Sequence, residues 1–237
     1  MTTVADASPR FMARIAGFLY VLMLPIGVLV KLAGGPIHVT SDAAVTAANI
    51  LAHPSLVHTT FAVGLLVVAC YIPVTALLYE LFAPVNRSVS LTAAFFSLVG
   101  CAIQAFASLF HIAPLVLLTG MQSLRGIQHD QVTALAYLLM KLYAPVYRIG
   151  LVFFGSYLVL IGYLIFRSTF LPRLLGVAVV IAGLGWLTFL WPPLGTYLWP
   201  RVILTLAIGE GALILWLLIV GVNAQRWHER AGTAVRT

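Results

Sequence analysis

The residues of this chain most able to do chemistry are ionisable side chains that lie inside long apolar stretches. Glu210 lies within the apolar run at 202–222, about eight residues from its start, which is roughly 12 Å along a helix. His111 lies at a similar distance from the end of the run at 91–118. A charge at the centre of a spanning helix costs roughly 2.5–3.5 kcal/mol, so such groups are candidates for ligand binding or proton transfer.

Two further polar residues complete this candidate site. Arg148 directly precedes the run at 149–166, and Gln104 lies two helical turns from His111 on the same helix face. We predict a polar pocket in the outer half of the membrane, formed by Glu210, His111, Arg148 and Gln104. Two structural alternatives stay open: Glu210 pairs with Arg148 or His111 only to hold helices together, or Glu210 stays protonated.

Three histidines precede the second apolar run, and histidine is a common ligand of transition metals. The spacing of His38, His53 and His58 matches no metal-binding motif, so we interpret them as exposed loop residues and predict no metal site. The two cysteines, Cys70 and Cys101, both lie within apolar runs, which favours free thiols over a disulfide.

Sequence motifs that bind cofactors are absent. The chain contains no His-Glu-x-x-His, Cys-x-x-Cys, Walker phosphate loop or Gly-x-Gly-x-x-Gly. Haem ligation by two histidines needs both well inside apolar runs, and only His111 is. A retinal Schiff base needs a lysine deep in a spanning helix, whereas we expect Lys31 and Lys141 near the membrane boundaries. We therefore expect no cofactor.

The elements that must position these residues follow from composition. Of the 237 residues, 62% are hydrophobic and 8% are charged, whereas about a quarter of a soluble domain is charged. Unpaired backbone groups are too costly in lipid, so each apolar run must be helical, and none alternates as barrel strands do. We predict an all-α integral membrane protein with a single transmembrane domain, residues 1–237. It is a bundle of six transmembrane helices, with spans of about 14–33, 58–82, 90–119, 147–167, 172–191 and 201–223.

The basic residues indicate topology and not a nucleic-acid partner. The formal net charge is +7, but the Lys and Arg residues stand singly at the ends of apolar runs, without a basic stripe. With a cytoplasmic N-terminus, eight of the 13 Lys and Arg residues face the cytoplasm, as the positive-inside rule favours. Six spans then place both the N- and the C-terminus in the cytoplasm.

Three segments outside the predicted spans have patterns of their own. Asp42 is typical of a helix start, and it predicts a short outer amphipathic helix near 42–52. Residues 131–147 form either an interfacial helix that ends before Pro145 or an outward extension of the fourth span. We predict a tight outer turn at 191–200. Within the third span, close helix packing is predicted by a seam of small side chains at every fourth position, namely Ala93, Ser97, Cys101 and Ala105.

Several segments, taken in order, resemble one family. These are RIAGFLY at 14–20, DAAVTAANIL at 42–51, PVNR at 84–87, GLVFFG at 150–155, FLPR at 170–173 and GEG at 209–211. Together they resemble the bacterial membrane family catalogued as domain of unknown function 4386. The resemblance implies a multi-pass protein of the bacterial inner membrane, with no established activity. It also implies a histidine shortly before residue 150, where this chain has Tyr143 and Tyr147.

Three functions fit these residues. The first is non-catalytic binding of a small or lipid-like molecule in the outer-leaflet pocket, as a sensor or accessory subunit. The second is a small proton-coupled secondary transporter with Glu210 as proton carrier, although no inverted repeat is apparent. The third is an intramembrane enzyme that uses Glu210 and His111 as acid and base on an apolar substrate. We favour the first, with the lipid bilayer as surroundings and with the oligomeric state left open.

Overall fold

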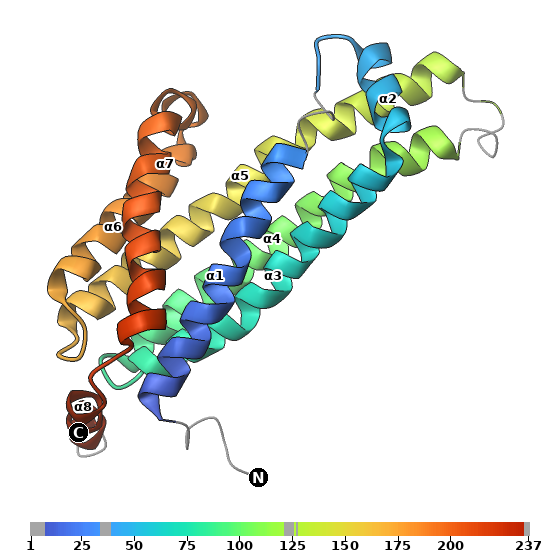
Figure 1. Cartoon of the computed structure of the whole chain (residues 1–237). Coiled ribbons are helices and arrows are strands. Elements are labelled where there is room, and N and C mark those ends of the chain that lie inside the picture. Colours follow the sequence, from blue (N-terminus) through green and yellow to red (C-terminus); the bar gives the residue numbers. More distant parts are fainter. Residues whose placement is uncertain (1–7, 34–38, 121–125, 127, 235–237) are drawn as a thin grey trace. The chain divides into compact units, whose positions relative to one another are not determined.

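The computed structural model describes residues 8–33, 39–120, 126 and 128–234, with no side-chain detail for 24–33 and 234. Every regular element in these ranges is helical and none is a strand, which confirms the predicted all-α class. The helices (Figure 1) are α1 (Pro9–Ala33), α2 (Ala43–Ala52), α3 (Pro54–Phe82), α4 (Arg87–Thr119), α5 (His129–Arg167), α6 (Arg173–Leu187), the 3₁₀ turn η3 (Thr188–Leu190), α7 (Pro192–Leu215), the π-helical η4 (Trp216–Val220) and α8 (Ala224–Ala234).

Five stretches of described helix are long and apolar enough to cross a membrane. They are α3, α4, α5, the continuous pair α6 and η3, and the continuous pair α7 and η4. They correspond to the second to sixth predicted spans, although the fifth exceeds its helix by one residue at each end and the sixth runs three residues past η4. The first predicted span, 14–33, lies in α1, which is helical over 25 residues. Because many side chains of α1 lie outside the described residues, the span at 14–33, and with it the total of six, stays a prediction. The side of the membrane on which each terminus lies also stays a prediction.

The α5 helix decides between the two interpretations of residues 131–147. It runs for 39 residues with Pro145 inside it, so this segment extends the fourth span and does not form a separate interfacial helix. A proline removes one backbone hydrogen bond from a helix, which kinks it but does not have to end it. The extension carries Tyr143 one helical turn before Tyr147, and their rings lie 5.9 Å apart.

The predicted tight turn at 191–200 is wrong, because α7 already begins at Pro192. Trp191 precedes it in an extended conformation, and the two prolines that follow occupy the first helical positions. There the missing N–H of proline would have no helical partner, and its fixed φ angle already suits the helix. Pro200 lies inside α7. The prolines of this segment therefore start and interrupt a helix.

The short helix predicted near 42–52 is present as α2. The side chain of Asp42 accepts hydrogen bonds from the backbone N–H groups of Ala44 at 2.7 Å and Val45 at 3.4 Å. These bonds cap the N-terminus of the helix, as the sequence predicted. Its position on the outer surface of the membrane stays a prediction.

By its internal contacts, the chain divides into two compact units. Unit 1 comprises residues 1–22, 70–101 and 149–237, and unit 2 comprises residues 23–69 and 102–148. Four helices, α1, α3, α4 and α5, contribute residues to both units. The predicted single transmembrane domain stays a prediction.

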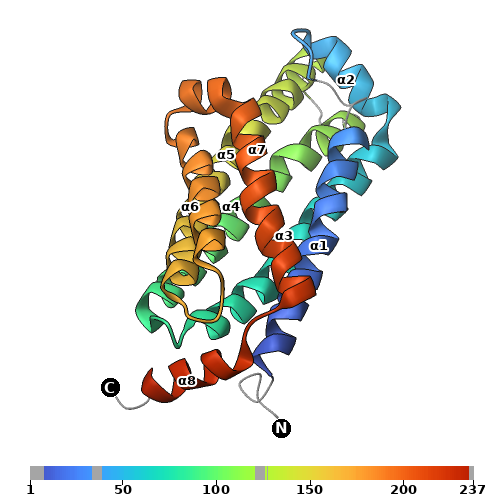
Figure 2. The same ribbon diagram turned by 60° about the vertical axis from the view of Figure 1, so that its left-hand side comes forward.

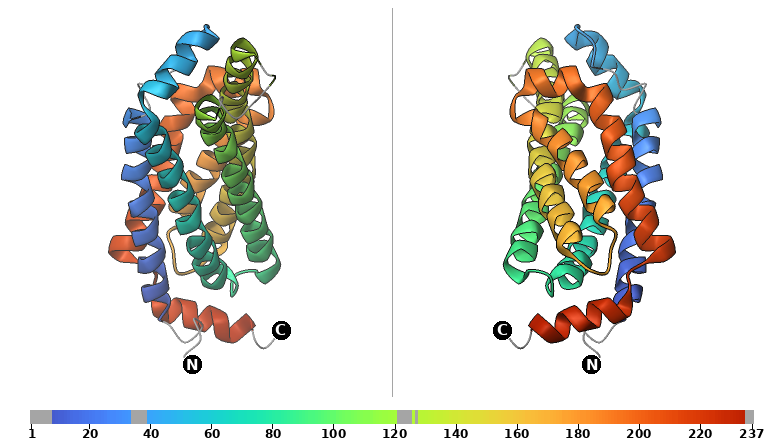
Figure 3. Two further views of the ribbon diagram at one scale, coloured as in Figure 1. Left: turned by 90° about the vertical axis from the view of Figure 1, so that its right-hand side faces the viewer. Right: turned by 90° about the vertical axis from the view of Figure 1, so that its left-hand side faces the viewer.

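Helices of unit 1 meet backbone to backbone at glycines. A methyl group on Gly162 of α5 would lie 2.7 Å from the carbonyl oxygen of Gly176 in α6, and one on Gly209 of α7 would lie 2.5 Å from that of Ala178. No real side chain fits at such distances. The absence of side chains at Gly162, Gly176 and Gly209 therefore lets α6 lie directly against both α5 and α7, as Figures 2 and 3 show.

Unit 1 ends in a helix that was not predicted from the sequence. After η4, Gly221 adopts a positive φ of 72°, and α8 turns away from α7 (Figure 2). The Trp227 indole N–H donates to the carbonyl oxygen of Leu81 at the end of α3, at 2.9 Å. The Arg226 guanidinium donates to the carbonyl of Thr169, at 3.2 Å. These bonds fix α8 to the ends of α3 and α5.

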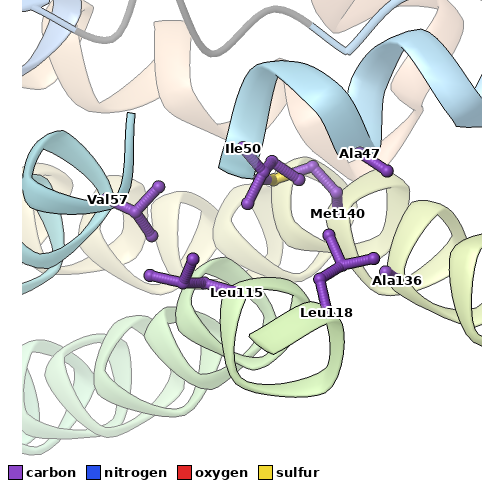
Figure 4. Close-up of a cluster of buried hydrophobic side chains, with 7 residues drawn as sticks. All are labelled: Ala47, Ile50, Val57, Leu115, Leu118, Ala136 and Met140. Carbon is purple, nitrogen blue, oxygen red and sulfur yellow. The ribbon is translucent and has the colours of Figure 1, made fainter. Parts of the chain in front are cut away.

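Unit 2 is held by a layer of apolar side chains. Ile50 of α2 and Met140 of α5 lie in the middle of this layer and are almost fully buried (Figure 4). The layer joins α2, α3, α4 and α5, and its members are Ala47, Ile50, Val57, Leu115, Leu118, Ala136 and Met140. The Tyr137 hydroxyl adds a hydrogen bond to the carbonyl of Thr40, at 3.1 Å.

Candidate functional site

Glu210 of α7 is an ionisable residue of unit 1 that lies inside an apolar spanning helix. The indole N–H of Trp186 in α6 donates to its carboxyl oxygen Oε1 at 3.1 Å. Side chains in a helix lean toward its N-terminus, and close contact of α6 with α7 at Gly209 brings the carboxyl within reach of the indole. The Trp186 ring is itself held by ring contacts with Phe189 and Trp199, at 6.2 and 6.0 Å between centroids.

Three tyrosines from three helices form a hydroxyl chain in unit 1. Tyr20 of α1 donates a hydrogen bond to the hydroxyl of Tyr71 in α3, at 3.2 Å. The hydroxyls of Tyr20 and Tyr157 in α5 lie 3.3 Å apart. Since the single hydrogen of Tyr20 is used toward Tyr71, Tyr157 must be the donor of the second bond. The chain therefore runs from Tyr157 through Tyr20 to Tyr71.

The carboxyl group of Glu210 interacts with this chain. It lies within Coulombic range of the hydroxyls of Tyr20, Tyr71 and Tyr157. Tyr20 and Tyr157 are buried, whereas Tyr71 and Glu210 are half-buried. Glu210 and the three tyrosines, together with Trp186, are called the polar cluster below.

Two groups of the polar cluster keep unused hydrogen-bonding capacity. Tyr71 accepts from Tyr20, and none of the described residues accepts the hydrogen of its own hydroxyl. A carboxylate has about four acceptor sites, and the Trp186 indole occupies one of them among the residues that the structure describes. Both groups are half-buried, so a bound molecule could reach a donor at Tyr71 and an acceptor at Glu210.

The residue after Glu210 is a glycine with no close neighbour outside its own stretch of helix. A side-chain carbon on Gly211 would meet no atom of another helix within 4 Å. By contrast, a methyl group on Gly17 of α1 would lie 2.6 Å from the backbone nitrogen of Leu218 in η4. Two turns separate Gly211 from Leu218 along α7 and η4, so the tight packing at Leu218 does not extend to Gly211.

One helical turn after Tyr71, a second pair of hydroxyl groups joins α3 to α4. Thr75 and Ser97 are buried and their hydroxyl oxygens lie 2.6 Å apart. Ser97 and the buried Cys101 belong to the predicted seam of small residues, and Ser97 confirms that this seam faces another helix. Cys101 and the half-buried Cys70 are free thiols, as predicted.

The other predicted site residues lie in unit 2. The His111 imidazole shares a 2.7 Å hydrogen bond with the Thr60 hydroxyl, and its ring lies 5.2 Å from that of Tyr143. Gln104 is buried and Arg148 is half-buried. Glu210 thus belongs to unit 1 and the other three residues to unit 2, so their convergence on one pocket stays a prediction.

Two of the loop histidines fall within the described residues. His53 and His58 are exposed, as predicted, and the ring of His53, the residue that caps α2, contacts the carbonyl of Asn49 in that helix, at 3.1 Å. His38 lies outside the described residues. No group of three or more potential metal ligands occurs in the part of the chain that the structure describes.

Sequence reasoning found Glu210 but missed the rest of the polar cluster. The available signal was depth: Tyr20, Tyr71 and Tyr157 lie well inside apolar runs, away from the headgroup region where tyrosine is common. A tyrosine hydroxyl buried at that depth must find a hydrogen-bond partner. Three of them in three separate runs indicate a shared polar centre.

The fold and this cluster indicate a multi-pass helical membrane protein with a polar site inside it. The protein belongs to the family described as domain of unknown function (DUF4386), which matches residues 15–221. This confirms the resemblance drawn from the sequence. No curated protein and no solved structure matches the chain.

Proposed function

We propose that this protein binds a small amphipathic or lipid-like molecule at Glu210, without catalysing a reaction, in the inner membrane of a bacterium. One observation carries the proposal: the half-buried carboxyl of Glu210 and the half-buried hydroxyl of Tyr71 keep an acceptor and a donor unused within the described residues. An ionisable group retained within a spanning helix is a functional site by default.

The chemistry of the cluster limits the kind of ligand. A donor at Tyr71 and an acceptor at Glu210 match a polar group that does both, such as a hydroxyl or an amide. The surroundings are aromatic, since the ring of Phe154 lies 4.6 Å from that of Tyr71. A molecule with one such group and an apolar body would enter from the bilayer, and Gly211, the residue after Glu210, presents no side chain that would block it.

A photoreactive long-chain alcohol tests this proposal. The purified chain in lipid nanodiscs is labelled with a diazirine-bearing alcohol, and the modified peptides are mapped by mass spectrometry. We expect labels around Gly211 in α7 and Tyr71 in α3. Glu210→Gln should lower this labelling about tenfold, because a hydrogen bond to a charged group contributes roughly 1.5–3 kcal/mol. Trp186→Phe should lower it less.

The matched control is Glu80→Gln, since Glu80 is a half-buried carboxyl of α3 outside the polar cluster. It should leave labelling unchanged. Thermal unfolding in the same nanodiscs shows whether each variant is folded. Equal labelling of a folded Glu210→Gln variant and the native protein would reject Glu210 as the binding residue.

A second function, proton-coupled transport, is favoured by one observation. A chain of hydroxyl hydrogen bonds beside a carboxyl group is a path along which a proton can move. Proteoliposomes with an entrapped pH dye separate the two functions. Alcohol-dependent proton uptake that Tyr20→Phe abolishes would support transport, and labelling without proton movement would support binding alone.

A further inference from the structure

A groove lies between α5 and α6 in unit 1, away from the polar cluster. Its volume is about 380 Å³ and its lining is apolar. One wall is formed by Val159, Tyr163 and Phe166 of α5, and the other by Val177, Val180 and Ile181 of α6.

The sequence builds this groove from two glycines. Gly176, which lines the groove, and Gly162 lie backbone to backbone, since a side-chain carbon on either would come within 2.7 Å of the other's carbonyl oxygen. Because the two helices touch where neither has a side chain, the larger lining residues of α5 and α6 form the two sides of the groove. Tyr163 and Ile181 are exposed at the sides of the groove, so it is open laterally.

A cation stands at one end of the groove. The guanidinium carbon of Arg173 lies 5.9 Å from the centre of the Phe166 ring, which is part of the wall. Arg167 ends α5 and Arg173 begins α6, so both arginines lie where the chain turns from one helix to the next. An apolar channel with a positive charge at its end is complementary to a molecule with an apolar chain and an anionic head.

We propose that an anionic phospholipid binds here, with one acyl chain in the groove and its phosphate on Arg173. Arginine binds phosphate through two parallel hydrogen bonds, and basic sites between membrane helices are suited to anionic headgroups. Free phosphate would make no use of the apolar walls. None of these residues belongs to the polar cluster, so this proposal does not depend on the proposed function.

The test compares two lipids with the same acyl chains. Native mass spectrometry of the full chain in detergent micelles measures retention of dioleoyl phosphatidylglycerol and dioleoyl phosphatidylcholine. We expect the native protein to bind phosphatidylglycerol about fivefold more tightly, as one arginine near anionic lipid predicts. Arg173→Gln should remove this preference, and Arg173→Lys should keep part of it. Val177→Trp should fill the groove and weaken both lipids.

Arg201→Gln is the matched control. Arg201 stacks on an aromatic ring with nearly the same geometry, 5.8 Å from the centre of Tyr197, but neither residue lines the groove. This variant should keep the native preference. Equal retention of the two lipids by the native protein, or an unchanged preference in folded Arg173→Gln, would overturn the proposal. So would inorganic phosphate alone raising the melting temperature as much as phosphatidylglycerol does.

Discussion

Unit 1 and unit 2 hold their helices together by different means. In unit 1, α5, α6 and α7 touch through backbone at glycines, and hydroxyl groups join α1, α3, α4 and α5. In unit 2, a layer of apolar side chains joins α2, α3, α4 and α5, and His111 of α4 shares a hydrogen bond with Thr60 of α3.

The difference between the units can be explained by the interactions that stabilise helix contacts in a lipid environment. Lipid chains are as apolar as leucine, so burial of apolar surface does not drive helices together in the membrane. Close van der Waals packing and hydrogen bonds between helices stabilise their association instead. Unit 1 uses both, which places polar groups from separate helices within hydrogen-bonding distance. A binding site needs such a rigid frame. The polar cluster lies in unit 1, where α6 meets both α5 and α7 backbone to backbone.

The largest loss of stability is expected from adding a side chain at a glycine contact between helices of unit 1. Gly162→Leu should destabilise the protein by about 3 kcal/mol or more, because the new side chain meets the backbone of α6. A side-chain carbon on Gly64 in unit 2 would meet no atom of another helix within 4 Å, so Gly64→Leu should be neutral or slightly stabilising because leucine favours helix. Unfolding in mixed micelles with increasing SDS measures both. Equal losses would show that glycine contacts do not distinguish the units.

A cavity in the apolar layer tests unit 2 in the same way. Ile50 is 1% exposed, so Ile50→Ala should cost about 2–4 kcal/mol through lost packing. Its neighbour Leu51 is 43% exposed, and Leu51→Ala should change stability by less than about 0.5 kcal/mol. Thermal unfolding of the two variants provides the comparison, and a loss at Leu51 equal to that at Ile50 would contradict the described layer.

The smallest expected effects concern the two hydroxyl bonds. Thr75→Val removes the partner of Ser97 at a fully buried site, and it should cost about 1 kcal/mol. Thr60→Val removes the partner of His111, which is half-buried, and it should cost about 0.6 kcal/mol. Thr59→Val, at an exposed position next to Thr60, is the control. A larger loss of stability for Thr60→Val than for Thr75→Val would contradict the view that hydrogen bonds between helices contribute more in unit 1 than in unit 2.

Much of the fold could be predicted because it depends on neighbours in sequence. Hydropathy located the spanning helices α3 to α7, and Asp42 marked the start of α2. Prediction failed where a local signal had two meanings. The prolines at 192 and 193 are typical of a turn and equally of a helix start, and only the structure shows the latter.

By itself, the sequence determined that this chain forms apolar helices long enough to cross a membrane, with one carboxyl group deep in the last of them. The tertiary structure decided the partners of that group. Trp186, Tyr20, Tyr71 and Tyr157 come from four helices, and the bonded tyrosines are up to 137 residues apart in sequence. Hydropathy fixes which residues enter a helix, but the contact of one helix face with another depends on glycines and hydroxyls that meet only after the helices pack.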